Sequence, residues 1–151
     1  MILISTIVFL FATAVQLSYI LLFRFRKRFS TTGGESPSIV SVIICAKNEA
    51  RHLEQFLPAV LQQEYEAEWE VIVVNDGSTD ETGNVLAGLQ QTYDHLKIVT
   101  IDPGTIKDIP GKKYALAQGI AAAKFDRLLL TDADCRPASA QWLHNMANHH
   151  K

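Results

Sequence analysis

Short apolar runs, separated by segments with helical periodicity, are the feature that most constrains the fold of this chain. Residues 39–46 and 70–75 are almost continuous in Val and Ile. Strands that are apolar on both faces are typical of parallel sheets that helices cover on each side. Residues 97–101 predict a third, more exposed strand, and the run that ends at Asp132 predicts a fourth.

Amphipathic segments lie between these runs. In residues 49–63 apolar side chains recur at helical spacing, with a kink or break expected at Pro58. Residues 80–93 and 112–123 predict two further helices, and Pro137 is expected to begin a last one. The alternation of strands and helices predicts an α/β fold with a right-handed, doubly wound parallel sheet of strand order 3-2-1-4.

Composition excludes some function classes. The 151 residues suit a single domain, and a net charge of −2 provides no basic surface field, so we expect no nucleic-acid partner. Cys45 and Cys135 lack metal-ligand spacing and cannot form a disulfide framework. Each follows an apolar run, so both are expected to be reduced, half-buried thiols.

The first residues predict a membrane anchor. Residues 2–23 contain no charged side chain. A helix of this length is long enough to cross the hydrocarbon core of a bilayer, which is about 30 Å thick. A signal peptide has basic residues before its apolar run, whereas here Arg24 and residues 26–28 follow it. A buried helix of a soluble protein is the other alternative. Segments rich in Lys and Arg that flank a membrane span stay on the cytosolic side. The chain after Arg24 is therefore expected in the cytosol.

This pattern divides the chain into three parts. Residues 1–24 are expected to form one transmembrane helix, and residues 25–38 a basic juxtamembrane segment and a polar linker with Gly and Pro. The α/β domain is expected to occupy residues 39–151.

Two acids follow the fourth expected strand directly. Ligands of open α/β sheets bind beyond the carboxyl ends of the strands, and side chains two residues apart on an extended segment point the same way. Asp132 and Asp134 are therefore placed to bind one target together. Carboxylates and substrate phosphates are the ligands that Mg²⁺ prefers, which favours a metal–phosphate site. The alternative is that the two acids only open a loop or cap the next helix.

Polar residues also follow the first two expected strands, at residues 47–49 and at Asp76. Acids that converge on one crevice repel each other unless a cation or a hydrogen-bonding ligand lies among them. A sugar nucleotide would supply both a diphosphate for a metal and hydrogen-bond donors for Asp76. The following Ser78 and Glu81 have the spacing of a helix capping box.

Lys112 stands at the expected start of a helix, directly after Gly111. Free backbone N–H groups and the helix dipole favour anions there, so the Lys112 side chain is a candidate to contact a diphosphate. The alternative is that Lys112 and Lys113 only form a solvated helix face.

Four segments together resemble the family 2 glycosyltransferases, which have the Rossmann-like GT-A fold. They are residues 41–49 (SVIICAKNE), 71–80 (VIVVNDGSTD), 111–116 (GKKYAL) and 129–134 (LLTDAD). By this resemblance Ala46 and Glu49 line the uracil or ribose pocket and Asp76 contacts the nucleoside. Lys112 lies near the donor phosphates, and Asp132 and Asp134 hold Mg²⁺ or Mn²⁺, with Asp134 the direct ligand.

The resemblance implies a metal-dependent, inverting transfer of a hexosyl or N-acetylhexosaminyl group. The donor would be a nucleotide-sugar, expected to be a UDP-sugar, and the acceptor a polysaccharide, a lipid or another glycan. An anchor followed by a cytosolic domain resembles the membrane-anchored bacterial members of the family. This resemblance implies a cytoplasmic domain at the inner membrane. Ala117 stands where the family often has Asn. The acceptor half and its general base are expected beyond Lys151, so these residues would form the donor-binding half and transfer little or no sugar alone.

Two other functions fit parts of the pattern. A haloacid-dehalogenase-type phosphatase also places Asp-x-Asp after a strand, but it expects Thr or Val where Cys135 stands and needs a further Lys and acids downstream. A non-catalytic, membrane-tethered domain that binds a nucleotide or another subunit is the second. In an isolated domain the fourth strand would be an exposed edge with an apolar face, which predicts a marginally stable protein prone to association.

Overall fold

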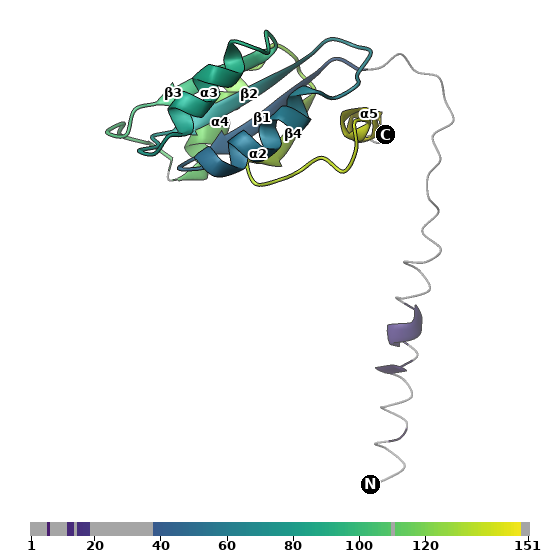
Figure 1. Ribbon diagram of the computed structural model, residues 1–151. Helices are drawn as coiled ribbons and strands as arrows, with labels where there is room; N and C mark the ends of the chain where they lie inside the picture. Colours follow the sequence, from purple (N-terminus) through teal and green to yellow (C-terminus); the bar gives the residue numbers. More distant parts are fainter. Residues whose placement is uncertain (1–5, 7–11, 14, 19–37, 110, 149–151) are drawn as a thin grey trace. The chain divides into compact units, whose positions relative to one another are not determined.

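The computed structural model describes residues 6, 12–13, 15–18, 38–109 and 111–148 (Figure 1). The chain divides into two units, Met1–Gly34 and Glu35–Lys151, and each is described by itself. The described residues of the first unit are helical. Most of the predicted transmembrane segment, and the whole basic segment after it, lie outside the described residues. Within the described part of the chain, no helix has both the length and the apolar character needed to span a membrane.

The second unit is built on one sheet of four parallel strands in the order β3-β2-β1-β4, as the sequence predicts. The strands are β1 (Val40–Ala46), β2 (Trp69–Asp76), β3 (Leu96–Ile101) and β4 (Leu128–Asp132). Their register pairs Ala46 with Asn75 and Cys45 with Asp132. The carboxyl ends of β1, β2 and β4 therefore meet at one edge of the sheet.

Helices cover both faces of this sheet (Figure 1). They are α2 (Ala50–Leu61), α3 (Thr82–Gln90), α4 (Lys112–Ala122) and α5 (Trp142–Asn148). The buried side chains of α2, α3 and α5 share one apolar cluster with one face of the strands. α4 packs against the opposite face, so β1 and β2 are covered on both sides.

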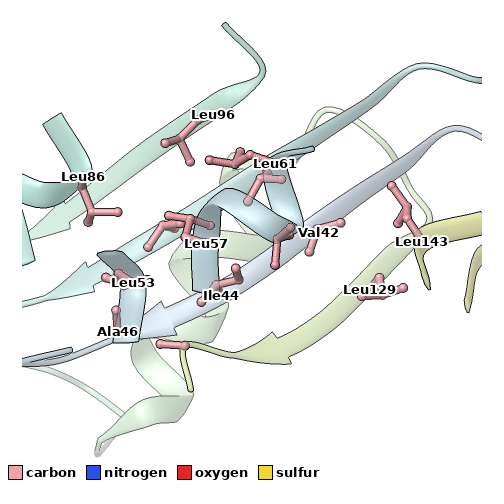
Figure 2. Packing of buried hydrophobic residues seen from close by; sticks show 14 of the residues in the cluster. Val42, Ile44, Ala46, Leu53, Leu57, Leu61, Leu86, Leu96, Leu129 and Leu143 are labelled. Atoms are coloured by element: carbon pink, nitrogen blue, oxygen red, sulfur yellow. The ribbon is translucent and has the colours of Figure 1, made fainter. Parts of the chain in front are cut away.

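Alternation along β1 explains why its sequence is apolar apart from Ser41. Val42 and Ile44 point toward α2, where Leu53 and Leu57 pack against the sheet (Figure 2). Ile43 lies on the α4 side and is also buried. Because both faces of β1 are buried, apolar side chains are favoured at successive positions, as the sequence predicted.

β4 is an edge strand, because it pairs only with β1 among the described strands. Leu130 lies opposite Ile43 in the register, yet its side chain is 53% exposed. α4 packs on β1, β2 and β3 and leaves this residue open. An exposed apolar side chain on the fourth strand was expected from the sequence.

Two helix boundaries differ from the sequence prediction. α2 continues through Pro58 to Leu61, so the alternative of a break at the proline is wrong. α5 begins at Trp142 and not at Pro137, which lies in the preceding loop. The start of α5 is fixed by the buried Gln63 side chain, which accepts a hydrogen bond from the Leu143 N–H at 3.0 Å. No local pattern in the sequence reveals this long-range contact.

Gly119 allows α4 to lie close on the sheet. A Cβ atom there would lie 2.7 Å from Cγ2 of Ile43 and 2.9 Å from Cγ2 of Val74. Both neighbours are fully buried and cannot move away freely. Gly88 on α3 is an exposed helical glycine with open space around it.

These two glycines give opposite predictions for the same substitution. Gly119→Ala should lower the free energy of unfolding by about 1 kcal/mol, because overpacking costs about 1–3 kcal/mol and the better helix propensity of Ala returns about 1 kcal/mol. Gly88→Ala should raise it by about 0.5–1 kcal/mol. Urea unfolding of both variants measures the difference, and equal shifts of the same sign would contradict the close packing of α4.

Candidate functional site

A cleft opens at the carboxyl ends of β1 and β2, beside the start of α4. Its volume is about 440 Å³, within the range of small-molecule sites. It lies at the edge where the strand order reverses around β1, which is where ligands of doubly wound sheets bind. It is lined by Cys45, Ala46, Lys47, Glu49, Asp76, Lys107, Gly111, Lys112 and Ala115.

Asp76 is the last residue of β2 and lies almost completely inside the protein. Its carboxylate is paired with the ammonium group of Lys107, which comes from the loop between β3 and α4. Gly77 holds that loop near by: its φ is 65°, and a Cβ atom there would lie 3.0 Å from the Cα of Pro103. The close approach of the two chain segments brings Lys107 to Asp76.

Lys112, the first residue of α4, forms a second ion pair, with the carboxylate of Asp132 at the end of β4. This hydrogen bond raises the pKa of the Lys112 ammonium group, which therefore stays charged at neutral pH. Both side chains are more than half exposed, at 63% and 57%. Exposed ion pairs contribute little to stability, so a charged ligand can displace this one at low cost.

Asp134 lies next to Asp132 in the turn that follows β4. One carboxylate oxygen of each and the Sγ atom of Cys135 all lie within 4.8 Å of one another, and all three residues are exposed. The Cys135 N–H donates to the Asp132 carbonyl at 3.2 Å, which closes the turn. The two carboxylates therefore approach each other through a turn and not, as predicted, along an extended strand.

The donor set suits a hard divalent cation. Mg²⁺ and Mn²⁺ prefer carboxylate oxygens, and they complete their shells with water or phosphate oxygens. Asp132 and Asp134 fit this preference, whereas the thiol of Cys135 does not. Cys135 is also exposed and not half-buried as predicted.

Cys45 is half-buried, as predicted, and its thiol lines the cleft. Burial raises the pKa of this thiol; the nearby Lys112 opposes the shift, and the charges of Asp76 and Asp132 add to it. Cys45 therefore stays a neutral thiol at neutral pH and contributes a small, weakly polar surface to the cleft.

Side chains from the β2–α3 loop and from the first residue of α3 cap the start of α2. The backbone N–H groups of residues 48–50 donate to Ser78 Oγ at 2.9 Å, Thr82 Oγ1 at 2.9 Å and Asp80 Oδ2 at 3.3 Å. The Asn48 side chain returns the contact by accepting the Thr79 N–H at 2.8 Å. These bonds join the segment that contains Glu49 to the loop that directly follows Asp76.

The predicted capping box is wrong. The Ser78 hydroxyl accepts from Asn48, and α3 begins only at Thr82, whose N–H donates to Asp80 at 3.1 Å. The hydrogen bond from the Thr82 side chain is the largest of the contacts that lower the pKa of the Asp80 carboxyl group. Ser78 and Asp80 cap α2, yet they stand in the sequence where residues that cap α3 would stand. The local sequence therefore resembles a capping box.

The structure places the predicted site residues at the same edge of the sheet. Ala46, Glu49, Asp76 and Lys112 line the cleft. Glu49 is held there by His52, whose Nδ1 lies 2.6 Å from its carboxylate. Asp132 forms an ion pair with Lys112, which lines the cleft, and Asp134 lies beside Asp132.

Lys107 is the cleft residue that the sequence does not reveal. It lies in a loop with neither strand nor helix periodicity, and its neighbours Ile106 and Ile109 are both exposed. The packing of Pro103 against Gly77 and the ion pair with Asp76 place the loop beside the cleft.

Comparison with known proteins decides the family. The family model "Glycosyl transferase family 2" matches residues 41–151. The chain belongs to this family. The match includes all four strands except the first residue of β1, and it includes every residue of the cleft.

Individual proteins are similar over the same region. "Probable glycosyltransferase YdaM" of Bacillus subtilis is 37% identical over 99 residues, which are 65% of this chain and 23% of the relative. A mannosyltransferase of Pyrobaculum calidifontis, solved with GDP-Man and Mn²⁺, superposes with a TM-score of 0.62 at 27% identity and covers 90% of this chain and 40% of that one. S. aureus TarS 1–349 with UDP-GlcNAc gives 0.59 at 25% identity, over 73% and 30%. This chain thus spans less than half the length of each.

The capping contacts of Asp80 predict a pH-dependent effect. Its carboxyl pKa is lower in the folded protein than in the unfolded chain, so its contribution to stability is complete above about pH 3.9 and disappears as the pH falls through the lower, folded value. Asp80→Asn should therefore lower the thermal midpoint at pH 7, with a smaller difference from the wild type at acid pH.

The matched control is Asp126→Asn, which changes an exposed carboxylate that has no hydrogen-bond partner among the described residues. It should leave the midpoint unchanged at both pH values. A loss from Asp80→Asn that is equal at neutral and acid pH would show that the charge of Asp80 does not stabilise the caps.

Proposed function

We propose that this chain binds a nucleotide-sugar, expected to be a UDP-sugar, and serves sugar transfer to a hydroxyl group of a glycan or lipid acceptor. The observation that carries the proposal is the convergence of Asp76, Lys112 and the Asp132–Asp134 pair from three separate elements on one edge of the sheet. A nucleoside, a diphosphate and a cation need these three kinds of partner side by side.

The nucleoside would occupy the cleft. Asp76 offers a buried carboxylate to the cleft, Glu49 offers a second one, and the small side chain of Ala46 leaves room for a flat ring. Hydrogen bonds from a base or ribose to a buried carboxylate are charge-assisted, and these are stronger than those between neutral groups. The solved relatives with UDP-GlcNAc and with GDP-Man support a nucleoside diphosphate-sugar as the ligand.

The diphosphate would lie between Lys112 and the two aspartates. When a cation binds Asp132 and Asp134, the ammonium group of Lys112 loses its carboxylate partner and is free to contact a phosphate oxygen. The first N–H groups of α4, an eleven-residue helix, would also be available to the same anion. Bound Mg²⁺ or Mn²⁺ would stabilise the negative charge on the departing diphosphate.

A location at the cytoplasmic face of the inner membrane is proposed from the sequence. The support is the uncharged run of residues 2–23 and the basic residues after it. Protease added to intact cells should leave the α/β domain uncut and should cut it after the cells are opened. Cleavage of the domain in intact cells would refute this orientation.

The proposal predicts metal-dependent nucleotide binding. In calorimetric titrations of the full chain with UDP, Mn²⁺ should raise the affinity by at least about tenfold, because cation and diphosphate bind together. Asp134→Asn removes a carboxylate from the cation site and should abolish that increase, while the metal-free affinity stays the same.

Asp126→Asn is the control, since it removes a carboxylate outside the cleft. Equal UDP affinity with Mn²⁺ and with EDTA would contradict the assignment of the cation site. The absence of UDP binding by the folded chain would contradict the proposed function itself.

A further inference from the structure

His52 contacts Glu49, one of the residues that line the cleft, and no part of the proposed function requires this contact. Nδ1 of His52 lies 2.6 Å from Oε2 of Glu49. An ionised carboxylate accepts hydrogen bonds and does not donate them, so the proton of this bond lies on Nδ1. Both side chains are partly enclosed, with 45% of His52 and 33% of Glu49 exposed. The pair either only stabilises the first turn of α2 or prepares Glu49 for a ligand.

The ring of His52 is held in one orientation. Phe56 lies one helical turn further along α2, and residues at this spacing are neighbours on the surface of a helix. The two rings stack, with their centroids 6.0 Å apart and their planes inclined by 8°. One face of the imidazole lies against Phe56 while Nδ1 is bonded to Glu49, so the ring has little freedom to rotate. His52 is therefore an ordered donor and not a freely moving surface histidine.

The carboxylate of Glu49 is not needed to cap its own helix. Glu49 is the N-cap residue of α2, a position whose side chain often accepts an N–H group of the helix, yet it makes no such bond. The side chains of Ser78, Asp80 and Thr82 bind the backbone at the start of α2 instead. Oε1 of Glu49 has no hydrogen-bond partner among the described residues, since His52 bonds to Oε2. One oxygen of a cleft carboxylate is thus anchored and the other is available.

We propose that His52 is a positioning residue of the cleft, whose Nδ1–H group anchors Oε2 of Glu49 so that Oε1 is presented to a hydroxyl or N–H donor of the nucleoside. This inference rests on the proposed function and adds a residue that acts through Glu49 without touching the ligand. A glutamate side chain has three rotatable bonds, and ordering a mobile side chain during binding lowers affinity. Because His52 orders Glu49 in advance, the ligand meets a carboxylate that is already in place.

The test measures the dissociation constant of UDP for the full chain by calorimetry, with Mn²⁺ and with EDTA. His52→Leu removes the donor, keeps an apolar contact with Phe56 and suits a helix. It should weaken UDP binding about three- to tenfold, the effect of ordering one side chain on binding. The factor should be the same with Mn²⁺ and with EDTA, because Glu49 serves the nucleoside and not the cation.

Two further substitutions distinguish positioning from a merely structural role. His52→Asn places an amide N–H group close to the position of Nδ1 and should keep the UDP affinity within about twofold of the wild type. Glu49→Ala removes the carboxylate that His52 positions, and it removes no cap because this side chain does not cap α2. In the Glu49→Ala background, His52→Leu should change the UDP affinity by less than about twofold, since nothing is left to position.

His144→Leu on α5 is the matched control. His144 also contacts an aromatic ring, that of Tyr65, and it is hydrogen-bonded to the side chain of Asn148, but it lies outside the cleft. This substitution should leave the UDP affinity unchanged. Thermal unfolding of each variant checks that it is folded.

The outcomes separate the inference from the function on which it rests. Positioning by His52 is wrong, while nucleotide binding stands, if His52→Leu binds UDP as tightly as the wild type or if His52→Asn binds it as weakly as His52→Leu. The same conclusion follows if His52→Leu costs as much affinity in the Glu49→Ala background as in the wild type. If the folded wild type binds no UDP, both the inference and the proposed function are wrong.

Discussion

Parallel pairing of β1 with β2 on one side and β4 on the other is the constraint on which the rest of the structure depends. The register brings Ala46 level with Asn75 and Cys45 level with Asp132, so three strands end at one edge. Such pairing requires apolar side chains on both faces of β1 and long crossovers that bury them. Those requirements fix the helices, and the helices leave the carboxyl ends open. The cleft is a consequence of the topology.

Several carboxylates lie at the open edge and repel one another when no ligand is bound. Two lysine side chains of the protein balance this negative charge. Lys107 neutralises Asp76, and Lys112 neutralises Asp132. The two pairs differ in burial: the first is mostly enclosed, whereas the second is mostly exposed. The exposed pair is the one that a cation and a phosphate can replace, because water already screens it. The enclosed pair is largely shielded from water and is harder to separate.

The sequence was a good guide to whatever depends on local periodicity. The apolar β-branched runs predicted four strands and their order. The candidate residues at or just after the strand ends, and Lys112 at the start of α4, lie at one edge of the sheet as expected: Ala46, Glu49, Asp76, Lys112, Asp132 and Asp134. Contacts between distant segments were missed. Ser78 and Asp80 cap a helix thirty residues earlier in the chain, Gln63 and not Pro137 sets the start of α5, and Lys107 enters the cleft from a loop without periodicity. Such contacts depend on how loops pack, which no local pattern encodes.

The central claim is that one edge of the sheet binds the nucleoside, the diphosphate and the cation together. A crystal structure of the full chain with UDP and Mn²⁺ tests it most directly. The nucleoside should lie against Asp76, and the diphosphate should lie between Lys112 and a Mn²⁺ ion held by Asp132 and Asp134. UDP bound elsewhere, for example in the groove lined by Trp69 and His95 at the other end of the strands, would contradict it.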